Sequence, residues 1–252
     1  MTELGENLEV LEEAIGAACR KAGRARADVE LMAVSKTYPA ATIAEAAELG
    51  LRVFGENRVQ EFGAKAVELE PWRAEGSNAA ADAPILVHLI GHLQSNKALR
   101  AVELFDAIDS LDSLRLAERV NEAAGKLGKR VPVLIEVKLS PEETKAGLEP
   151  ESDEASQLLE KLADLHSLDV RGLMTIAPWG VAEDVTRACF QSLREWRDKW
   201  AASYPKLDFG VLSMGMSGDF ALAIEEGATR IRVGTALFGK RAPQAESLAG
   251  PE

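Results

Sequence analysis

The feature that most constrains the fold is an alternation of short apolar runs with helical patterns, repeated eight times along the chain. Each apolar run is typical of a buried strand, and the segment after each of the first seven runs carries apolar residues at helical spacing. Strands are predicted at residues 31–35, 51–54, 85–90, 104–109, 131–137, 168–176, 207–213 and 230–233. Helices are predicted at residues 40–49, 57–69, 95–102, 113–127, 151–165, 183–201 and 217–226. This alternation predicts an α/β protein with a parallel sheet.

Eight such units in a chain of 252 residues predict a closed (β/α)8 TIM barrel rather than an open, doubly wound sheet. An extra amphipathic helix is predicted before the first strand, over residues 3–22. Residues 71–84 have no periodicity and predict a surface loop. We expect one domain over residues 1–242 and a disordered tail at 243–252.

Charge and composition restrict the partners that this chain can have. The formal net charge is −12 and no basic block offsets it, so no nucleic-acid partner is expected. No apolar window of about 18 residues indicates a membrane span, and the acidic N-terminus does not resemble a signal peptide. Cys19 and Cys189 each lie in a helical pattern, so free thiols are expected. These features predict a soluble, cytoplasmic protein.

A lysine and an asparagine follow the first two predicted strands. In barrels of this kind the active site lies at the C-terminal ends of the strands. Lys36 follows the first apolar run, where partial removal from water favours a neutral amine that can form a Schiff base with an aldehyde. Asn57 follows the second run. Lys36 is therefore the candidate for covalent attachment of a ligand.

Polar and small residues at the last two strand ends indicate a phosphate site. Ser213 and Met214 end the seventh strand, and Ser217 is predicted to be the N-cap of the next helix, where backbone N–H groups face outward. Gly234 and Thr235 follow the eighth strand and offer further N–H groups and a hydroxyl. Barrels commonly bind phosphate at these two loops.

The lysine and the phosphate site are expected to be neighbours, because closure of the barrel sets the eighth strand beside the first. Their combination predicts pyridoxal 5′-phosphate, or a phosphorylated sugar in a Schiff-base aldolase. Arg232 lies two residues before Gly234 and is predicted to point into the same ring of side chains. An arginine facing the pyridine nitrogen would keep that nitrogen unprotonated.

The sequence also resembles the family of pyridoxal phosphate homeostasis proteins, from about residue 30 to about residue 240. The matching stretches are AVSKTYP, FGENRVQEF, HLIGHLQSNK, SPEETKAGL, GLMTIAP and LSMGMSGDFALAIEEGATRIRVGTALFGKR. The resemblance implies the alanine racemase type of barrel, one pyridoxal phosphate bound to Lys36 and no established catalysis. It further implies that Ser217, Gly234 and Thr235 hold the phosphate. It places Arg232 at the ring nitrogen and Asn57 near the cofactor.

The chain departs from the family pattern at three places. Arg58 stands where tyrosine is frequent, and Val87 stands where tryptophan is frequent. Glu136-Val137-Lys138 replaces a more usual Val-Asn pair on the fifth strand. Because of these departures, the family pattern does not predict the side-chain contacts along the second, third and fifth strands.

A pyridoxal phosphate-dependent racemase or decarboxylase is the main alternative. Racemisation needs a second acid/base group on the opposite face of the ring, and the only tyrosines are Tyr38 and Tyr204. A Schiff-base aldolase using Lys138 is another alternative. His88 and His92 share a strand face without an evident third ligand, so no metal is expected.

The expected partners are pyridoxal phosphate and the apoenzymes that receive it. We expect a monomer, with a dimer as the alternative.

Overall fold

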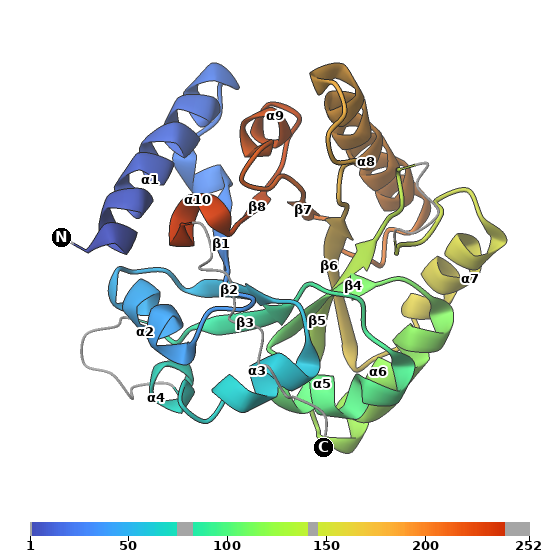
Figure 1. The fold of residues 1–252 in the computed structure, drawn as a ribbon. Coiled ribbons are helices and arrows are strands. Elements are labelled where there is room, and N and C mark those ends of the chain that lie inside the picture. Colours follow the sequence, from blue (N-terminus) through green and yellow to red (C-terminus); the bar gives the residue numbers. More distant parts are fainter. Residues whose placement is uncertain (1, 75–82, 141–145, 240–252) are drawn as a thin grey trace, which may run out of the picture.

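Eight parallel strands close into a barrel in chain order in the computed structural model, which describes residues 2–74, 83–140 and 146–239 (Figure 1). The circle closes where β8 pairs with β1. The strands are β1 (Glu30–Val34), β2 (Val53–Glu56), β3 (Leu86–Leu89), β4 (Ala107–Leu111), β5 (Val131–Glu136), β6 (Leu168–Met174), β7 (Val211–Ser213) and β8 (Arg230–Val233). The predicted TIM barrel is confirmed.

Helices surround the barrel and alternate with its strands (Figure 1). They are α1 (Glu3–Lys21), α2 (Ala40–Glu48), α3 (Val59–Lys65), α4 (Glu70–Arg73), α5 (Ala98–Leu104), α6 (Leu114–Lys126), α7 (Asp153–Leu162), α8 (Glu183–Ser203), α9 (Phe220–Glu225) and α10 (Thr235–Phe238). Two short 3-10 helices, η1 (Arg26–Asp28) and η2 (Ser95–Lys97), complete the set. No described helix combines the length and the apolar character that a membrane span requires.

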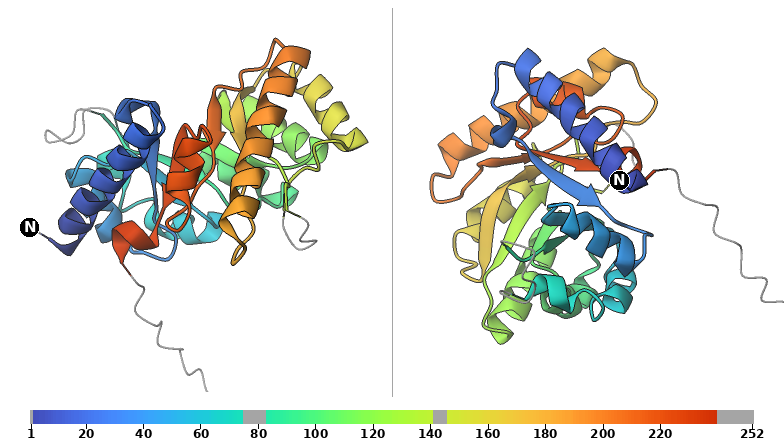
Figure 2. Two further views of the ribbon diagram at one scale, coloured as in Figure 1. Left: turned by 90° about the horizontal axis from the view of Figure 1, so that it is seen from above. Right: turned by 90° about the vertical axis from the view of Figure 1, so that its left-hand side faces the viewer.

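The extra N-terminal helix is present as α1. Thr2 caps it by accepting a hydrogen bond from the backbone N–H of Gly5 at 3.2 Å. Acidic side chains lie in its first turn and basic ones in its last, which suits the helix dipole. α1 packs against α9 and α10 and so covers the seam where β8 meets β1 (Figure 2).

Alternate residues of each strand face the helices and the barrel interior. In β1, Leu31 and Ala33 join the large apolar core between sheet and helices, while Met32 is buried outside that cluster. The interior also holds charged groups: the Asp109 carboxylate lies 3.0 Å from His88 Nδ1 and accepts a hydrogen bond from Arg230 at 3.1 Å. Burial alone would raise the pKa of Asp109, but His88 and the arginines lower it overall.

Some predicted boundaries are wrong. β4 begins at Ala107 because Leu104 still belongs to α5, so Asp109 lies inside the strand instead of at its C-terminal end. β7 has three residues where seven were predicted. Residues 70–73 form a helical turn, while most of the predicted 71–84 loop and the predicted tail lie outside the described residues. Cys19 and Cys189 are both buried, and neither forms a disulfide within the described residues.

Candidate functional site

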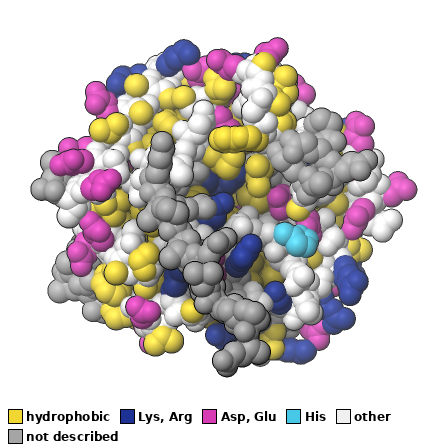
Figure 3. Space-filling view, in the orientation of Figure 1, with side chains coloured by type: hydrophobic (Ala, Val, Ile, Leu, Met, Phe, Trp, Pro, Cys, Tyr) yellow, Lys and Arg dark blue, Asp and Glu magenta, His cyan; other side chains and the backbone are white. Residues whose placement is uncertain are grey.

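A cavity of about 410 Å³ lies at the C-terminal ends of the strands. Its volume falls in the range of small-molecule sites, about 300–1,000 Å³. Six of the eight residues predicted for the cofactor line it: Lys36, Asn57, Ser217, Arg232, Gly234 and Thr235. Lysine and arginine side chains gather in the hollow at the centre of the face in Figure 3. The molecule is acidic overall, so this basic hollow favours an anionic ligand locally.

Lys36 lies in a tight turn directly after β1. The N–H of Tyr38 donates to the carbonyl of Ser35 at 3.0 Å, which closes the turn around Lys36 and Thr37. Thr37 has a φ of 71°, the only positive φ of a non-glycine residue in the described part of the chain. A left-handed residue of this kind is strained and persists only when its surroundings hold it. The lysine is half-buried.

A carboxylate from α3 holds this turn. Glu61 accepts a hydrogen bond from the backbone N–H of Thr37 and another from Lys65 at 3.2 Å. Burial would raise the pKa of Glu61, but these two donors outweigh it and lower the pKa. Lys65 also donates to Glu56 at 2.9 Å, and Glu56 accepts from the Ser35 hydroxyl at 2.8 Å. Both residues that flank Lys36 are therefore fixed by side chains of β2 and α3.

Arg232 reaches the cavity from the interior of β8. Its guanidinium donates to the Ser213 carbonyl at 2.7 Å, to the Ser213 hydroxyl at 2.8 Å and to the Thr175 carbonyl at 2.8 Å. Arg232 is 4% exposed. Burial lowers the pKa of this guanidinium, an effect that nearby carboxylates such as Asp109 oppose. These contacts fix the orientation of the guanidinium against β6 and β7.

The loops after β7 and β8 supply donors for an anion. The predicted N-cap role of Ser217 is wrong, because α9 begins at Phe220 and Asp219 occupies the N-cap position. The Ser217 hydroxyl instead accepts the N–H of Ala236 at 3.3 Å and so ties the two loops together. Within the described residues, no acceptor takes the backbone N–H of Ser217, Gly218 or Thr235. All three residues line the cavity.

Ser213 and Met214, the other two predicted residues, do not line the cavity. Both are fully buried. Ser213 accepts a hydrogen bond from Arg232 through its carbonyl, and Met214 packs in the core. Asn57 lies at the wall of the cavity because Gly91 allows it to approach: a Cβ on Gly91 would be 2.2 Å from the carbonyl oxygen of Asn57.

Several lining residues carried no signal in the sequence pattern. Trp179 lines the cavity with 83% of its surface exposed, and Ile176 and Met216 lie beside it. Tyr38 also lines the cavity; its hydroxyl donates to the Gly239 carbonyl at 3.0 Å. Tyr38 could have been expected here from its position two residues after Lys36. Trp179 could not, because its loop after β6 has no periodicity.

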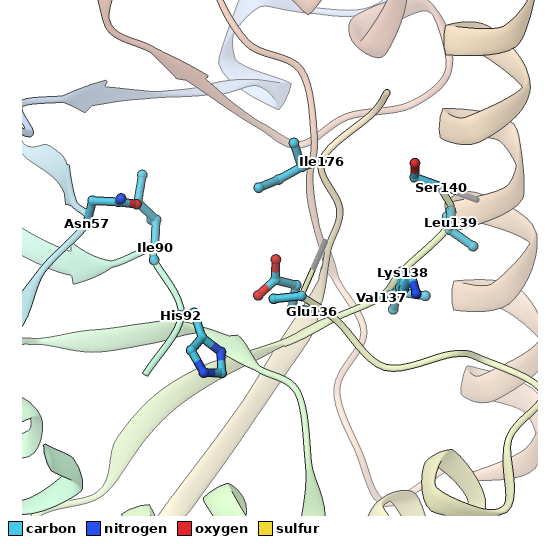
Figure 4. Close-up of a pocket in the computed structure, with 11 residues that line it drawn as sticks. Asn57, Ile90, His92, Glu136, Val137, Lys138, Leu139, Ser140 and Ile176 are labelled. Atoms are coloured by element: carbon cyan, nitrogen blue, oxygen red, sulfur yellow. The ribbon is translucent and has the colours of Figure 1, made fainter. Parts of the chain in front are cut away.

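A second, smaller chamber of about 190 Å³ adjoins the cavity and shares Asn57, Ile90 and Ile176 with it (Figure 4). Glu136, Lys138 and His92 line this chamber and not the larger cavity. His92 lies 2.9 Å from Asp112, while His88 pairs with Asp109 inside the barrel. The described residues contain no group of three or more potential metal ligands.

Comparison with known proteins identifies the family. The model of the alanine racemase N-terminal domain family matches residues 8–242. The pyridoxal phosphate homeostasis protein of Aquifex aeolicus is 42% identical over 236 residues, which cover 94% of this chain and 97% of that protein. The pyridoxal phosphate homeostasis protein of Escherichia coli K12 is 37% identical over 244 residues, which cover 96% of this chain and 98% of that protein.

Solved structures give the same result. PipY of Synechococcus elongatus with pyridoxal phosphate bound is 43% identical, with a TM-score of 0.79 over 94% of this chain and 100% of that one. Alanine racemase of Clostridium difficile is 17% identical, with a TM-score of 0.71 over 95% of this chain and 58% of that one, and shares the barrel fold. The chain therefore belongs to the alanine racemase N-terminal domain family and, within it, to the pyridoxal phosphate homeostasis proteins.

Proposed function

We propose that this protein binds pyridoxal 5′-phosphate in the larger cavity, attached to Lys36, and serves the cellular supply of that cofactor without turning over a substrate. The observation that carries this proposal is the meeting, in one cavity of about 410 Å³, of Lys36 with N–H groups of two loops that have no acceptor among the described residues. Relatives named as pyridoxal phosphate homeostasis proteins, and one structure with the cofactor bound, support it.

The donor set fits a phosphate monoester. The N–H groups of Ser217, Gly218 and Thr235, together with two hydroxyls, can surround an anion without a metal. An added Cβ on Gly218 would meet no heavy atom within 4 Å, so the backbone there is open to a ligand. Ser217, Gly218 and Thr235 would therefore hold the phosphate, and Gly234, which lines the same cavity, would lie beside it.

Lys36 and Arg232 would hold the other end of the cofactor. Pyridoxal phosphate supplies an aldehyde that condenses with an amine, with loss of water, and a pyridine ring that withdraws electrons when its nitrogen is protonated. The Lys36 amine is the group placed to bind the aldehyde carbon. Arg232 would face the ring nitrogen, and because a guanidinium retains its proton, it would leave that nitrogen unprotonated. Asn57 would contact the cofactor from the wall.

The same cavity argues against racemisation. Its ionisable side chains, among the described residues that line it, are Lys36, Tyr38 and Arg232. The Tyr38 hydroxyl already donates to the Gly239 carbonyl, and its ring lies 4.9 Å from that of Phe238. A racemase needs a second proton-transferring group opposite the lysine.

We infer that the protein partners are apoenzymes that receive the cofactor.

Substitution of Lys36 tests the attachment. Purified wild-type protein saturated with pyridoxal phosphate is expected to show a visible absorbance band and an adduct that borohydride reduction makes permanent. Lys36→Ala is expected to lose both, because it removes the amine that binds the aldehyde. The variant should still fold, since the Lys36 side chain lies at the end of a strand and not in the core. Lys126→Ala is the matched control, since Lys126 is an exposed residue of α6.

The outcomes separate the candidate functions. A reduced adduct that survives Lys36→Ala would contradict the assignment, and an adduct mapped to Lys138 would support the aldolase instead. Conversion of L-alanine to its enantiomer by the cofactor-loaded protein would support the racemase.

A further inference from the structure

The smaller chamber is a distinct compartment beside the cofactor cavity. It lies at the end of β5, between that strand and the wall formed by Asn57, Ile90 and Ile176 (Figure 4). An engineered cavity of about 150 Å³ accommodates benzene. A chamber of about 190 Å³ is therefore large enough for a compact molecule of about six to eight non-hydrogen atoms.

One wall presents a buried carboxyl group with an oxygen atom that no described residue satisfies. Glu136 is 5% exposed, and its Oε2 atom has no hydrogen-bond partner among the described residues. Figure 4 shows the carboxyl group pointing into the chamber. Burial and the negative charge of Asp112 raise the pKa of Glu136 to about 7, while Arg232 and His92 lower it less. An unpaired buried carboxyl costs stability, and a donor that enters the chamber recovers this loss.

The remaining walls carry the opposite charge and apolar surface. The Lys138 side chain is 16% exposed, and among the described residues its ammonium pairs with the exposed Glu149 carboxylate, at 3.5 Å. A contact of that length with a solvated partner contributes little. His92 adds a second nitrogen-bearing side chain, and Leu139 with Ile176 offers apolar contact. The chamber thus combines an acceptor for a cation, a donor for an anion and room for an aliphatic group.

Simpler ligands match only part of this set. A metal ion would need further ligands, and the described residues contain no group of three or more. An anion alone would leave the Glu136 carboxyl group without a donor and would place a second negative charge close to it. A cation alone would leave Lys138 unused. A small zwitterion satisfies both groups.

We propose that this chamber binds a small α-amino acid without covalent attachment, with its ammonium group on Glu136 and its carboxylate toward Lys138. The ligand would lie beside the cofactor cavity, because the two compartments share three wall residues. The site is defined by Glu136 and Lys138, which both line the chamber. Its occupancy does not depend on pyridoxal phosphate.

The test uses full-length protein freed of pyridoxal phosphate, so that no aldehyde can react with the probe. L-alanine is titrated by calorimetry, with propionate and ethylamine as probes that each lack one charge. We expect saturable binding of L-alanine and binding at least about tenfold weaker for either half-probe, the scale of a lost hydrogen bond to a charged group. Absence of saturable L-alanine binding would overturn the proposal.

Variants locate the site. Glu136→Gln keeps the shape of the side chain and removes its charge, so we expect affinity for L-alanine to fall about tenfold or more. Lys138→Ala is expected to weaken it several-fold. Glu122→Gln, at an exposed position of α6, is the matched control and is expected to bind as wild type does. Unchanged affinity in Glu136→Gln would refute the site.

A measurement on wild-type protein covers the case in which a variant does not fold. The backbone amide resonances of residues 137–139 are expected to shift when L-alanine is added, and no shift there would count against the chamber. Pyridoxal phosphate binding is measured separately by absorbance. Loss of the cofactor assignment and loss of the amino-acid site are therefore independent results.

Discussion

Glu136 is a single residue whose ionisation opposes folding. Its pKa rises from 4.5 in the unfolded chain to about 7 in the folded protein, chiefly because it is buried. Between these values the folded protein binds more protons than the unfolded chain does, so stability falls as the pH rises through this window. Above about pH 7 the free energy of unfolding stays lower by the full amount, of the order of 3 kcal/mol.

Glu136→Gln removes this dependence. We expect the variant to be about as stable as wild type near pH 4.5 and more stable by about 1–3 kcal/mol at pH 8. Urea unfolding at several pH values without added amino acid measures it. A variant less stable than wild type at pH 8 would mean that the carboxylate has a partner.

Ser217 joins the two loops of the phosphate site. Its hydroxyl accepts the Ala236 N–H in the absence of a ligand, and it is free to donate to a phosphate oxygen at the same time. Ser217→Ala is expected to weaken pyridoxal phosphate binding by about 0.5–2 kcal/mol. Spectroscopic titration measures the affinity, with Ser156→Ala on the exposed face of α7 as control. Equal affinity in Ser217→Ala and wild type would remove Ser217 from the site.

At the scale of elements, α3 positions the turn that carries Lys36. Glu61 is the acceptor for Thr37, whose positive φ would otherwise be costly. Glu61→Ala is expected to lower the free energy of unfolding by about 1–2 kcal/mol and to slow or weaken adduct formation at Lys36.

Glu61→Gln is the matched control for this prediction. It retains an acceptor oxygen for Thr37, so it should keep most of the adduct that Glu61→Ala loses. Both are measured by the borohydride-reduced mass on Lys36 as a function of cofactor concentration. If Glu61→Ala forms the adduct as wild type does, the turn does not depend on α3.

The order and type of the strands and longer helices could be predicted from the sequence, whereas the short helices α4 and α10 and several boundaries could not. Apolar periodicity identified all eight strands because parallel strands buried on both faces form nearly continuous apolar runs. For the same reason the boundary between α5 and β4 could not be predicted, since Leu104 and Phe105 extend the apolar run of β4 toward α5. Ser217, Gly218 and Asp219 are all plausible N-caps, so pattern alone could not show that Asp219 precedes α9.

At the scale of the whole molecule, closure of the barrel assembles the site. Pairing of β8 with β1 brings Arg232 and the β8 loop beside Lys36, almost 200 residues away in sequence. This neighbourhood could be predicted, because it follows from topology. The smaller chamber could not, because its existence depends on how Glu136 and Ile176 pack, and no periodicity encodes that.

The most direct test of the central claim is a crystal structure of the protein grown with pyridoxal 5′-phosphate. We expect electron density continuous from the Lys36 amine to the cofactor, with the phosphate against Ser217, Gly234 and Thr235 and the ring nitrogen facing Arg232. Density for the cofactor at another lysine, or a phosphate bound away from the loops after β7 and β8, would contradict it.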